Sequence, residues 1–437
     1  MTELYAVAGS PVLHSLSPEI FNSAFTVDGS DSIYLRLAAD SAREVMNTAA
    51  GMKIAGLNVT APFKEEIAGL IDDVDETAQR IGAVNTVRIK NSRSMGYNTD
   101  ASGVSAALEA AGTGLEGKKV VVLGSGGAAA AAVFSLITAG LKDIVIVNRS
   151  EARAEGLARR FGVSHVLFDN AEDSVRVADI IVSCLPAGAH PLRRQWLRRE
   201  QVLLDAGYTE SSLKQTAVEA GLKYLSGLEW LVAQAAHSFN VFTGRRAPVS
   251  VMKNAVDAAA GSTNSGRNIV VLTGMMGTGK TETGRALARI LGYDFIDTDE
   301  AVEKASGKSI GEIFAVQGEE AFRKIESEQV VPALQKHNTV VALGGGAVLD
   351  PVTVDLVSQT GCSVWLWADS ATCAGRIKGT KRPLLSGHEP SERLEQILRQ
   401  RRHLYARSCD MIVSTVDRTA QQAAKRIADE IGKSGPR

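Results

Sequence analysis

The sequence of 437 residues predicts an α/β protein with more than one domain, whose parallel sheets are covered by helices. Short apolar segments alternate with helix-like segments along most of the chain. Two glycine-rich turns, at 124–127 and 274–279, each follow an apolar segment and precede a helical one, which is typical of βα units. The composition, with 45% hydrophobic and 22% charged residues, is ordinary for a globular protein.

The first 100 residues contain four apolar segments that favour strands: LYAVAG, SIYLRLA, IAGLNVT and AVNTVRI. We expect residues 1–100 to form a first domain, completed by the helical pattern at about 228–258. Lys64 and Asp100 lie in segments rich in Gly, Asn, Thr and Pro, which are typical of ligand loops. A buried lysine with a carboxylate partner can act as an acid or base, but spacing alone does not pair these two residues, and an exposed surface lysine is the alternative.

Residues 101–227 predict a Rossmann-type domain. The apolar segment VVVL, the turn GSGG, a helix and the segment IVIVN form a βαβ unit, and 179–184 and 201–205 predict further strands. Gly124, Gly126 and Ala129 match the dinucleotide pattern G-x-G-x-x-[GA]. The second strand ends at Asn148-Arg149-Ser150 instead of a carboxylate, with Arg153 one turn later, which favours the 2′-phosphate of NADP. Two exposed arginines at a helix start are the alternative.

Residues 258–267, AAAGSTNSGR, predict a linker because they are small and polar. Every motif on either side lies wholly within one half. We therefore expect each half to have its own core, and fragments 1–262 and 266–437 to be active separately.

Residues 268–437 predict a P-loop domain with a parallel sheet. Gly274 to Thr281 reads GMMGTGKT, a full match to G-x-x-x-x-G-K-[ST] between a strand and a helix. In such a loop Lys280 contacts the β and γ phosphates of a nucleoside triphosphate, and Thr281 can be a ligand of Mg²⁺. An ordinary glycine turn is the alternative.

Several residues of this half are candidates for the phosphate acceptor site. Asp297 and Asp299 follow an apolar strand, where they either hold Mg²⁺ and a hydroxyl or cap a helix. Gly344 to Gly346 follow a buried strand and either allow close approach of a ligand or form a plain tight turn. The basic residues of 376–402 form either a solvated face or a lid over phosphate.

Together these motifs resemble shikimate kinase over residues 267–432. The resemblance includes F-R at Arg323, R-P-L-L from Arg382 and R-x-x-L-Y from Arg401. It implies that Asp299 binds shikimate and deprotonates the attacking hydroxyl, and that Asp297 contacts Mg²⁺ weakly or through water. The implied shikimate-binding residues are Asp299, Arg323, Gly345 and Arg401. The implied ATP-binding residues are Gly277, Thr278, Gly279, Lys280, Thr281, Glu282 and the lid residue Arg382; Glu282 stands where the family usually has Thr, and it either weakens nucleotide binding or points to solvent.

Residues 1–258 resemble shikimate dehydrogenase. Five motifs occur in the family's order: H-S-L-S-P from His14, N-V-T-A-P-F-K from Asn58, G-A-V-N-T from Gly82, N-T-D from Asn98 and G-L-E-W-L-V-A-Q from Gly227. The resemblance implies that Lys64 is the catalytic acid/base and Asp100 its partner. The implied substrate-binding residues are Ser15, Ser17, Thr60, Lys64, Asn85, Asp100, Tyr208 and Gln234. The implied NADP-binding residues are Gly124, Ser125, Gly126, Gly127, Ala128, Asn148, Arg149, Ser150, Arg153, Ala206 and Gly227.

Three segments near the expected nicotinamide depart from the family pattern. The usual N-A-T-P-x-G is Ser183 to Gly188 here, the usual aromatic- and Pro-containing stretch after Asp205 reads A-G-Y-T-E-S-S-L, and the usual Met is Trp230. These departures bear on NADP(H) affinity and placement. They leave a second interpretation, in which a non-catalytic, shikimate-sensing module is fused to an active kinase. A third interpretation is a catabolic quinate/shikimate dehydrogenase half.

The sequence therefore predicts reduction of 3-dehydroshikimate with NADPH, followed by phosphorylation of shikimate with MgATP. A net charge of −1 is against general binding to nucleic acid or membrane surfaces. The four cysteines lack metal-site spacing, and the N-terminus lacks a signal-peptide pattern, so we expect a cytoplasmic enzyme. The uncharged stretch Val120 to Leu141 is read as a strand, turn and helix. The sequence does not predict the oligomeric state.

Overall fold

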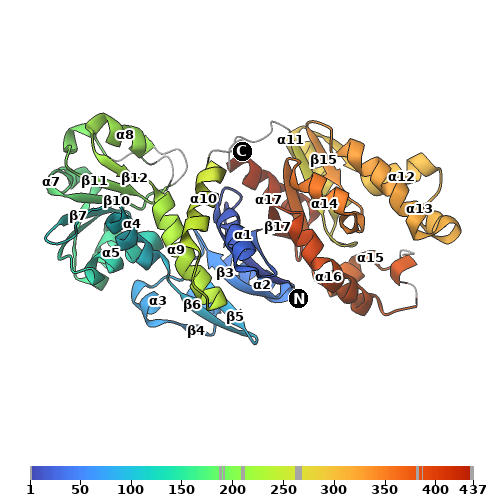
Figure 1. The fold of residues 1–437 in the computed structure, drawn as a ribbon, viewed down its shortest axis with the longest axis horizontal. Helices are drawn as coiled ribbons and strands as arrows, with labels where there is room; N and C mark the ends of the chain where they lie inside the picture. Colours follow the sequence, from blue (N-terminus) through green and yellow to red (C-terminus); the bar gives the residue numbers. More distant parts are fainter. Residues whose placement is uncertain are drawn as a thin grey trace. The chain divides into compact units, whose positions relative to one another are not determined.

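The computed structural model describes residues 2–186, 189, 192–207, 212–260, 268–379, 383–385 and 387–433. The chain forms two compact units. The first comprises Met1–Pro18, Ser30–Pro62 and Gly261–Arg437, and the second comprises Glu19–Gly29 and Phe63–Ala260. Figure 1 colours these segments along the chain.

The first unit is built on parallel strands that run in the order β14-β15-β13-β16-β17-β2-β1-β3. Their bounds are β1 (Glu3–Gly9), β2 (Ser32–Ala38), β3 (Ile54–Val59), β13 (Ile269–Thr273), β14 (Asp294–Asp297), β15 (Thr339–Ala342), β16 (Cys362–Trp367) and β17 (Met411–Ser414). Most of their residues are apolar and buried, because helices cover both faces of a parallel sheet.

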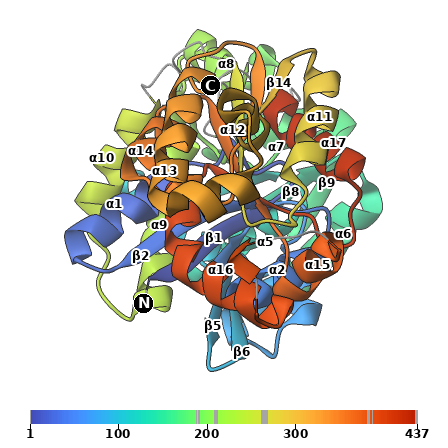
Figure 2. The same ribbon diagram turned by 90° about the vertical axis from the view of Figure 1, so that its right-hand side faces the viewer.

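The helices of the first unit include α11, which follows the phosphate loop and packs on α17, and α16, which packs beside β2 (Figure 2). Their bounds are α2 (Ala42–Met52), α11 (Lys280–Leu291), α12 (Thr298–Ser306), α13 (Ile310–Ala333), α14 (Pro351–Ser358), α15 (Ser370–Ile377), α16 (Pro390–Arg407) and α17 (Ala420–Lys433). Helix α13 bends at Gly318, whose φ of 83° is not helical.

Two strands from different halves of the chain lie side by side in the first unit, although the sequence favoured a separate core for each half. Strand β17 pairs in parallel with β2, with Ile412 opposite Leu37 and Val413 opposite Ala38. An edge strand presents unpaired backbone N–H and C=O groups, and β2 satisfies those of β17. The functional boundaries predicted at residues 100, 227 and 258–267 remain predictions, and 261–267 lie outside the described residues.

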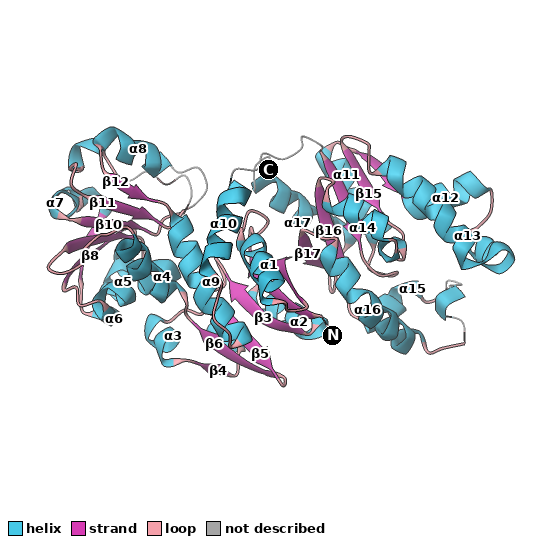
Figure 3. Ribbon diagram, in the orientation of Figure 1, coloured by secondary structure: helices cyan, strands magenta, loops and turns pink. Residues whose placement is uncertain are grey.

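The second unit contains a parallel sheet in the order β12-β11-β10-β7-β8-β9. Its strands are β7 (Lys119–Leu123), β8 (Asp143–Asn148), β9 (Ser164–Leu167), β10 (Ile180–Ser183), β11 (Val202–Asp205) and β12 (Lys223–Leu225). Helices lie on both faces (Figure 3). Val120 and Val122 of β7 belong to one hydrophobic core, and Val121 and Leu123 belong to the other. This alternation is the pattern expected of a doubly wound sheet.

The remaining elements of the second unit surround this sheet or form a small hairpin layer. The helices are α1 (Ser17–Asp28, from Glu19 onward), α3 (Glu76–Ile81), α4 (Asp100–Ala110), α5 (Gly127–Thr138), α6 (Glu151–Phe161), α7 (Glu172–Val177), α8 (Ser212–Ala220), α9 (Gly227–Thr243) and α10 (Val249–Ala260). The short strands are β4 (Asp73–Val74), β5 (Thr86–Lys90) and β6 (Arg93–Tyr97). Helix α1 joins α9 through an aromatic cluster of Phe21, Phe25, Phe239 and Phe242.

The α/β fold class predicted from the sequence is confirmed. The uncharged stretch Val120 to Leu141 contributes to β7 and forms α5, as expected. Among the described residues, no helix has the length and apolar character needed to cross a membrane.

Candidate active sites

Lys64 and Asp100 form a close, shielded ion pair in the second unit. Lys64 lies in the turn that follows β3, and Asp100 is the first residue of α4. The Lys64 Nζ lies 2.6 Å from the Asp100 Oδ2, and the two side chains are only 19% and 10% exposed. The structure thus pairs two residues that sequence spacing alone could not pair. A lysine held in this way can exchange a proton with a bound carbonyl or hydroxyl oxygen.

A buried network of polar side chains holds Thr99, the residue that precedes Asp100. The Asn85 Oδ1 accepts from the Thr99 backbone N–H at 2.7 Å, and the Asn85 Nδ2 lies 3.4 Å from the Gln234 Oε1. Ser238 lies 2.9 Å from both the Thr86 and Thr99 hydroxyls. The structure therefore brings the predicted residues Asn85 and Gln234 together. Sequence reasoning missed the supporting hydroxyls, although Thr86 and Thr99 stand within the quoted motifs.

Trp230 packs against the helix that begins with Asp100. Its side chain is 5% exposed, and its indole N–H donates to the Asp100 carbonyl at 3.0 Å. A Cβ added at Gly103 of α4 would lie 2.1 Å from the Trp230 ring. Trp230 thus anchors the helix that begins with Asp100.

The dinucleotide turn lies next to Lys64. Gly124 has a φ of +109°, which side-chain-bearing residues rarely adopt, and Gly126 precedes the first residue of α5. A Cβ added at Gly127 would lie 3.6 Å from the Lys64 side chain. The first turn of a helix presents backbone N–H groups that suit a pyrophosphate. Ser125 lies in the same glycine-rich turn, and Ala128 lies in the first turn of α5.

The residues expected to read the ribose follow β8. Asn148 ends the strand, and its Nδ2 donates to the Ser150 carbonyl at 3.1 Å. Ser150 is the N-cap residue of α6, and both Arg149 and Arg153 are exposed. Two exposed guanidinium groups at this strand end suit a phosphate dianion.

Further predicted nucleotide contacts gather at the ends of β10 and β11. The Ala206 N–H donates to the Ser183 carbonyl, and a Cβ at Gly227 would lie 2.5 Å from the Ala206 oxygen. Burial raises the pKa of the Cys184 thiol above its ordinary value, and the nearby Asp100 carboxylate raises it further. This thiol therefore stays neutral beside the Lys64–Asp100 pair. Tyr208, Ala187 and Gly188 lie outside the described residues.

The other predicted substrate residues of this half belong to the first unit. Ser15 and Ser17 are 5% and 4% exposed, and their hydroxyls lie 3.2 Å apart. Burial raises the pKa of the Tyr34 hydroxyl well above its ordinary value, so Tyr34 remains a donor to the Asn58 Oδ1 at 2.6 Å. Thr60, just after β3, is half-buried, and its backbone N–H donates to Ala8.

The phosphate loop has the backbone that its glycines predict. Gly274, Gly277 and Gly279 have φ angles of 137°, 85° and 86°. A Cβ at Gly274 would lie 2.4 Å from the Leu366 oxygen. The Lys280 Nζ donates to the Gly274 and Met275 carbonyls at 2.8 and 3.0 Å, which places its charge at the mouth of the loop. Thr278 closes the loop by donating to Met275.

Asp297 serves both as a helix cap and as a candidate Mg²⁺ contact. Its Oδ1 accepts from the Asp299 and Glu300 backbone N–H groups, so it is the N-cap of α12. Its Oδ2 accepts from the Thr281 hydroxyl at 2.6 Å. A hydroxyl and a carboxylate beside a phosphate loop are oxygen donors that suit Mg²⁺. The two predicted metal contacts are therefore adjacent.

The predicted acceptor residues meet around the three glycines that follow β15. A Cβ at Gly344 would lie 2.5 Å from the Asp299 Oδ1, and one at Gly346 would lie 2.4 Å from the Arg323 Nη1. The Arg401 Nη1 and the Tyr405 hydroxyl donate to the Gly345 carbonyl at 3.0 and 2.6 Å. Without side chains, the glycines allow one carboxylate and two guanidinium groups to surround the same short backbone segment.

Glu326 belongs to this cluster but was missed by sequence reasoning. It is 4% exposed, and its Oε2 accepts from the Arg323 Nη1 at 2.6 Å. Burial raises the pKa of Glu326, although Arg323 acts in the opposite direction. Its position one helical turn after Arg323 was the available signal.

The basic run at 376–402 divides between several roles. Arg376 donates to the Thr415 carbonyl and to the Gly277 carbonyl, so it braces the phosphate loop. Arg402 donates to the Met52 and Thr2 carbonyls. Arg382, the predicted lid residue, lies outside the described residues, and Glu282 is exposed at the start of α11.

Comparisons with known protein families match both halves. The shikimate dehydrogenase substrate binding domain matches residues 7–87, the shikimate / quinate 5-dehydrogenase family matches 106–204, and the shikimate 5′-dehydrogenase C-terminal domain matches 227–256. The shikimate kinase family matches residues 276–432.

Individual relatives and solved structures match the first half. The shikimate dehydrogenase (NADP(+)) of Moorella thermoacetica is 38% identical over 284 residues, which span 61% of this chain and 96% of the relative. The enzyme of the same name from Aquifex aeolicus is 34% identical and covers 58% of this chain and 96% of its own.

Among the solved structures, the shikimate 5-dehydrogenase of Thermus thermophilus in complex with NADP(H) and shikimate has a TM-score of 0.55 and 34% identity. It covers 59% of this chain and 99% of its own. The quinate dehydrogenase of Corynebacterium glutamicum in complex with NAD has a TM-score of 0.55, 26% identity and coverage of 59% and 99%. These matches confirm both resemblances drawn from the motifs: the chain belongs to the shikimate dehydrogenase family and carries a shikimate kinase domain in its C-terminal half.

Proposed function

We propose that this chain catalyses two consecutive reactions: reduction of 3-dehydroshikimate to shikimate with NADPH, and phosphorylation of shikimate to shikimate 3-phosphate with MgATP. The observation that carries the first reaction is the 2.6 Å Lys64–Asp100 pair beside the dinucleotide turn. The second is supported by the phosphate loop and by the cluster of Asp299, Arg323 and Arg401.

In the first reaction Lys64 gives a proton to the carbonyl oxygen that becomes the new hydroxyl. Asp100 keeps the ammonium group in place and stabilises its charge, and the Asn85–Thr99 hydrogen bonds fix the start of the Asp100 helix. NADPH, when bound, supplies the hydride. Arg149 and Arg153 are the proposed contacts to its 2′-phosphate. Ser15, Ser17, Thr60, Asn85 and Gln234 are the proposed contacts to the substrate's hydroxyls and carboxylate.

In the second reaction Asp299 orients the attacking hydroxyl and accepts its proton. Arg323 and Arg401 pair with the shikimate carboxylate, which suits the fixed fork of a guanidinium group. MgATP, when bound, supplies the γ-phosphoryl group. Lys280 neutralises charge at the phosphates, and Thr281 with Asp297 holds the cation.

A coupled assay tests this proposal. Purified protein with 3-dehydroshikimate, NADPH and MgATP should consume NADPH and release ADP, and ADP release should require NADPH when no shikimate is added. NADPH loss without ADP release would contradict the kinase assignment. ADP release only with added shikimate would favour the interpretation of a non-catalytic sensing module. Equal kcat/KM for NADPH and NADH would contradict the roles of Arg149 and Arg153.

Quinate oxidation is the second candidate for the dehydrogenase half. The likeness to the quinate dehydrogenase of Corynebacterium glutamicum favours it. Comparing kcat/KM for quinate and shikimate in the oxidative direction separates the two substrates.

A further inference from the structure

The loop that carries Ser15 and Ser17 is held by the last helix of the kinase half. Glu430 of α17 is fully buried at 0% exposure. Its Oε2 accepts from the backbone N–H groups of Val12 and Leu13 at 2.8 and 2.9 Å. Two buried backbone donors in this loop thus depend on a carboxylate that lies more than four hundred residues away in the sequence.

Neighbouring charged residues balance the negative charge of Glu430 and add further contacts between α17 and the N-terminal segment. Arg426, one turn earlier in α17 and 6% exposed, pairs with Glu430 and donates to the Ser10 hydroxyl at 2.8 Å. It also lies 3.3 Å from the Asp40 carboxylate. Arg418 pairs with Asp40 and lies 2.8 Å from Glu44. A buried carboxylate that is hydrogen-bonded to a guanidinium group keeps a fixed position as an acceptor, because neither group can rotate out to solvent.

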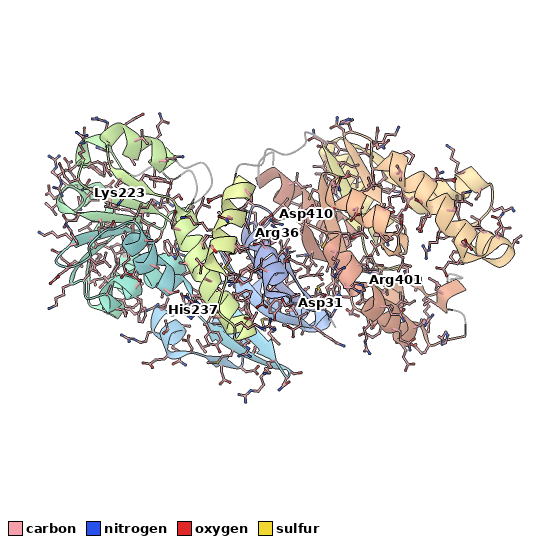
Figure 4. The ribbon with its side chains drawn as sticks, in the orientation of Figure 1. Asp31, Arg36, Lys223, His237, Arg401 and Asp410 are labelled. Carbon is pink, nitrogen blue, oxygen red and sulfur yellow. The ribbon has the colours of Figure 1, made fainter. Side chains whose placement is uncertain are left out.

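A second contact reaches the same loop directly at Ser15. Arg36 of β2 is 3% exposed, and its Nε donates to the Ser15 carbonyl at 2.9 Å. Its Nη1 reaches the Asp410 carbonyl at 3.4 Å. The Asp410 carboxylate accepts from the Ser363 N–H and hydroxyl at 2.8 and 2.9 Å. Figure 4 labels Arg36 and Asp410, which lie near each other where β2 meets β17.

We propose that Glu430 of the kinase half is a positioning residue for the substrate loop of the dehydrogenase half, so that the kinase helix helps the dehydrogenase bind its substrate. The proposal rests on the proposed function, because that function assigns Ser15 and Ser17 to the substrate. Proton transfer is assigned to Lys64 and Asp100 and not to Ser15 or Ser17. Loss of Glu430 should therefore weaken 3-dehydroshikimate binding more than it slows turnover.

The test uses the full chain with Glu430→Gln and Glu430→Ala. Glu430→Ala removes the acceptor of two buried N–H groups, and we expect KM for 3-dehydroshikimate to rise about tenfold or more, the scale of a lost charge-assisted bond. Glu430→Gln keeps an acceptor oxygen but loses the charge, and should give a smaller rise. KM for NADPH and the kinase parameters should stay within about twofold, which also shows that the variants are folded. Asp429→Asn, on the same helix, is the matched control and should change none of these values.

Each outcome decides one assignment. Active wild type with an unchanged substrate KM in both Glu430 variants overturns the positioning role. Parallel changes in KM for NADPH and in kinase kcat overturn it as well, because they show a general structural defect. Wild type that binds NADPH and phosphorylates shikimate but does not reduce 3-dehydroshikimate contradicts the proposed dehydrogenase function instead, and with it the positioning role.

Discussion

At the residue scale, the Lys64–Asp100 pair has geometry that a surface lysine would lack. The Nζ–Oδ2 distance is 2.6 Å and both side chains are largely shielded from water, so the pair is weakly screened. Lys64→Met keeps much of the side-chain volume but cannot give a proton. Dehydrogenase kcat should fall by roughly 10²–10⁴, the range for general acid catalysis, while kinase turnover is unchanged. Stopped-flow measurement of NADPH oxidation checks this, and full activity would require a different proton donor.

The role of Asp299 can be distinguished from that of its neighbour Asp297 by mutation. The sequence left open whether either residue only caps a helix, and the structure gives the cap to Asp297. Asp299→Asn keeps the size of the side chain but loses the charge that accepts a proton. We expect kinase kcat to fall by about 10²–10⁴ while ATP still binds. Turnover near the wild-type rate, measured by ADP release, would contradict the proposed role.

Residues that stand inside motifs could be predicted from the sequence, whereas their partners could not. Lys280 belongs to a pattern that a phosphate requires, and Lys64, Asn85 and Asp299 stand in segments on which the family resemblances rest. Glu430 is an ordinary acidic residue of an amphipathic helix, and its two acceptor contacts depend on where β17 places α17. Local sequence does not encode a contact of that separation.

At the scale of elements, helices α4 and α9 meet through a glycine and a tryptophan. A Cβ at Gly103 would lie 2.1 Å from the Trp230 ring, closer than any tolerated contact. Gly103→Ala should lower stability by about 1–3 kcal/mol through overpacking, despite the better helix propensity of Ala, and it should reduce dehydrogenase kcat because Asp100 begins the same helix. Thermal unfolding checks the first effect. Gly156→Ala in α6 is the matched control, since nothing lies within 4 Å of its added Cβ, and a similar loss there would contradict the packing argument.

The long apolar strands and the helices after the glycine turns were predictable because each carries its own signal. The segments at 143–148, 180–183 and 411–414 each contain the short continuous apolar run that is typical of a buried parallel strand. Strands β4, β6, β9 and β12 were not predicted. They are two to five residues long, and their sequences, such as Asp73-Val74 and KYL, lack a clear period, so neighbouring strands decide their conformation.

At the scale of the whole molecule, the pairing of β17 with β2 could not be foreseen from either half. Both segments read as ordinary strands, and nothing in a strand's own sequence says which edge it will meet. The structure adds side-chain contacts to the backbone pairing, among them Arg402 with the Thr2 and Met52 carbonyls and Arg426 with Ser10. The first three strands therefore belong to the same compact unit as the kinase half.

This arrangement predicts how the chain behaves when it is cut between its halves. A protease site inserted into residues 261–267 severs the covalent connection but leaves β2, β17 and α17 intact. The two pieces should stay associated, because separating them would expose strand edges and leave Glu430 and Arg426 without their partners. Size-exclusion chromatography of the cut protein should show one peak with both activities, at 0.1 M salt and at about 1 M salt, where only exposed charge pairs are strongly screened.

Further variants of the cut protein weaken the attachment between its two pieces. Arg426→Ala and Arg402→Ala remove contacts to Ser10, Met52 and Thr2, and combining them should let the cut pieces separate at micromolar concentration. Lys425→Ala, a change at an exposed position of α17, should leave the single peak unchanged. If the cut wild type separated into two active pieces, the halves would be independent enzymes, as their motifs alone suggest. One peak for the cut wild type and two for the double variant would show that the side-chain contacts of Arg402 and Arg426 are needed to hold the two enzymes together.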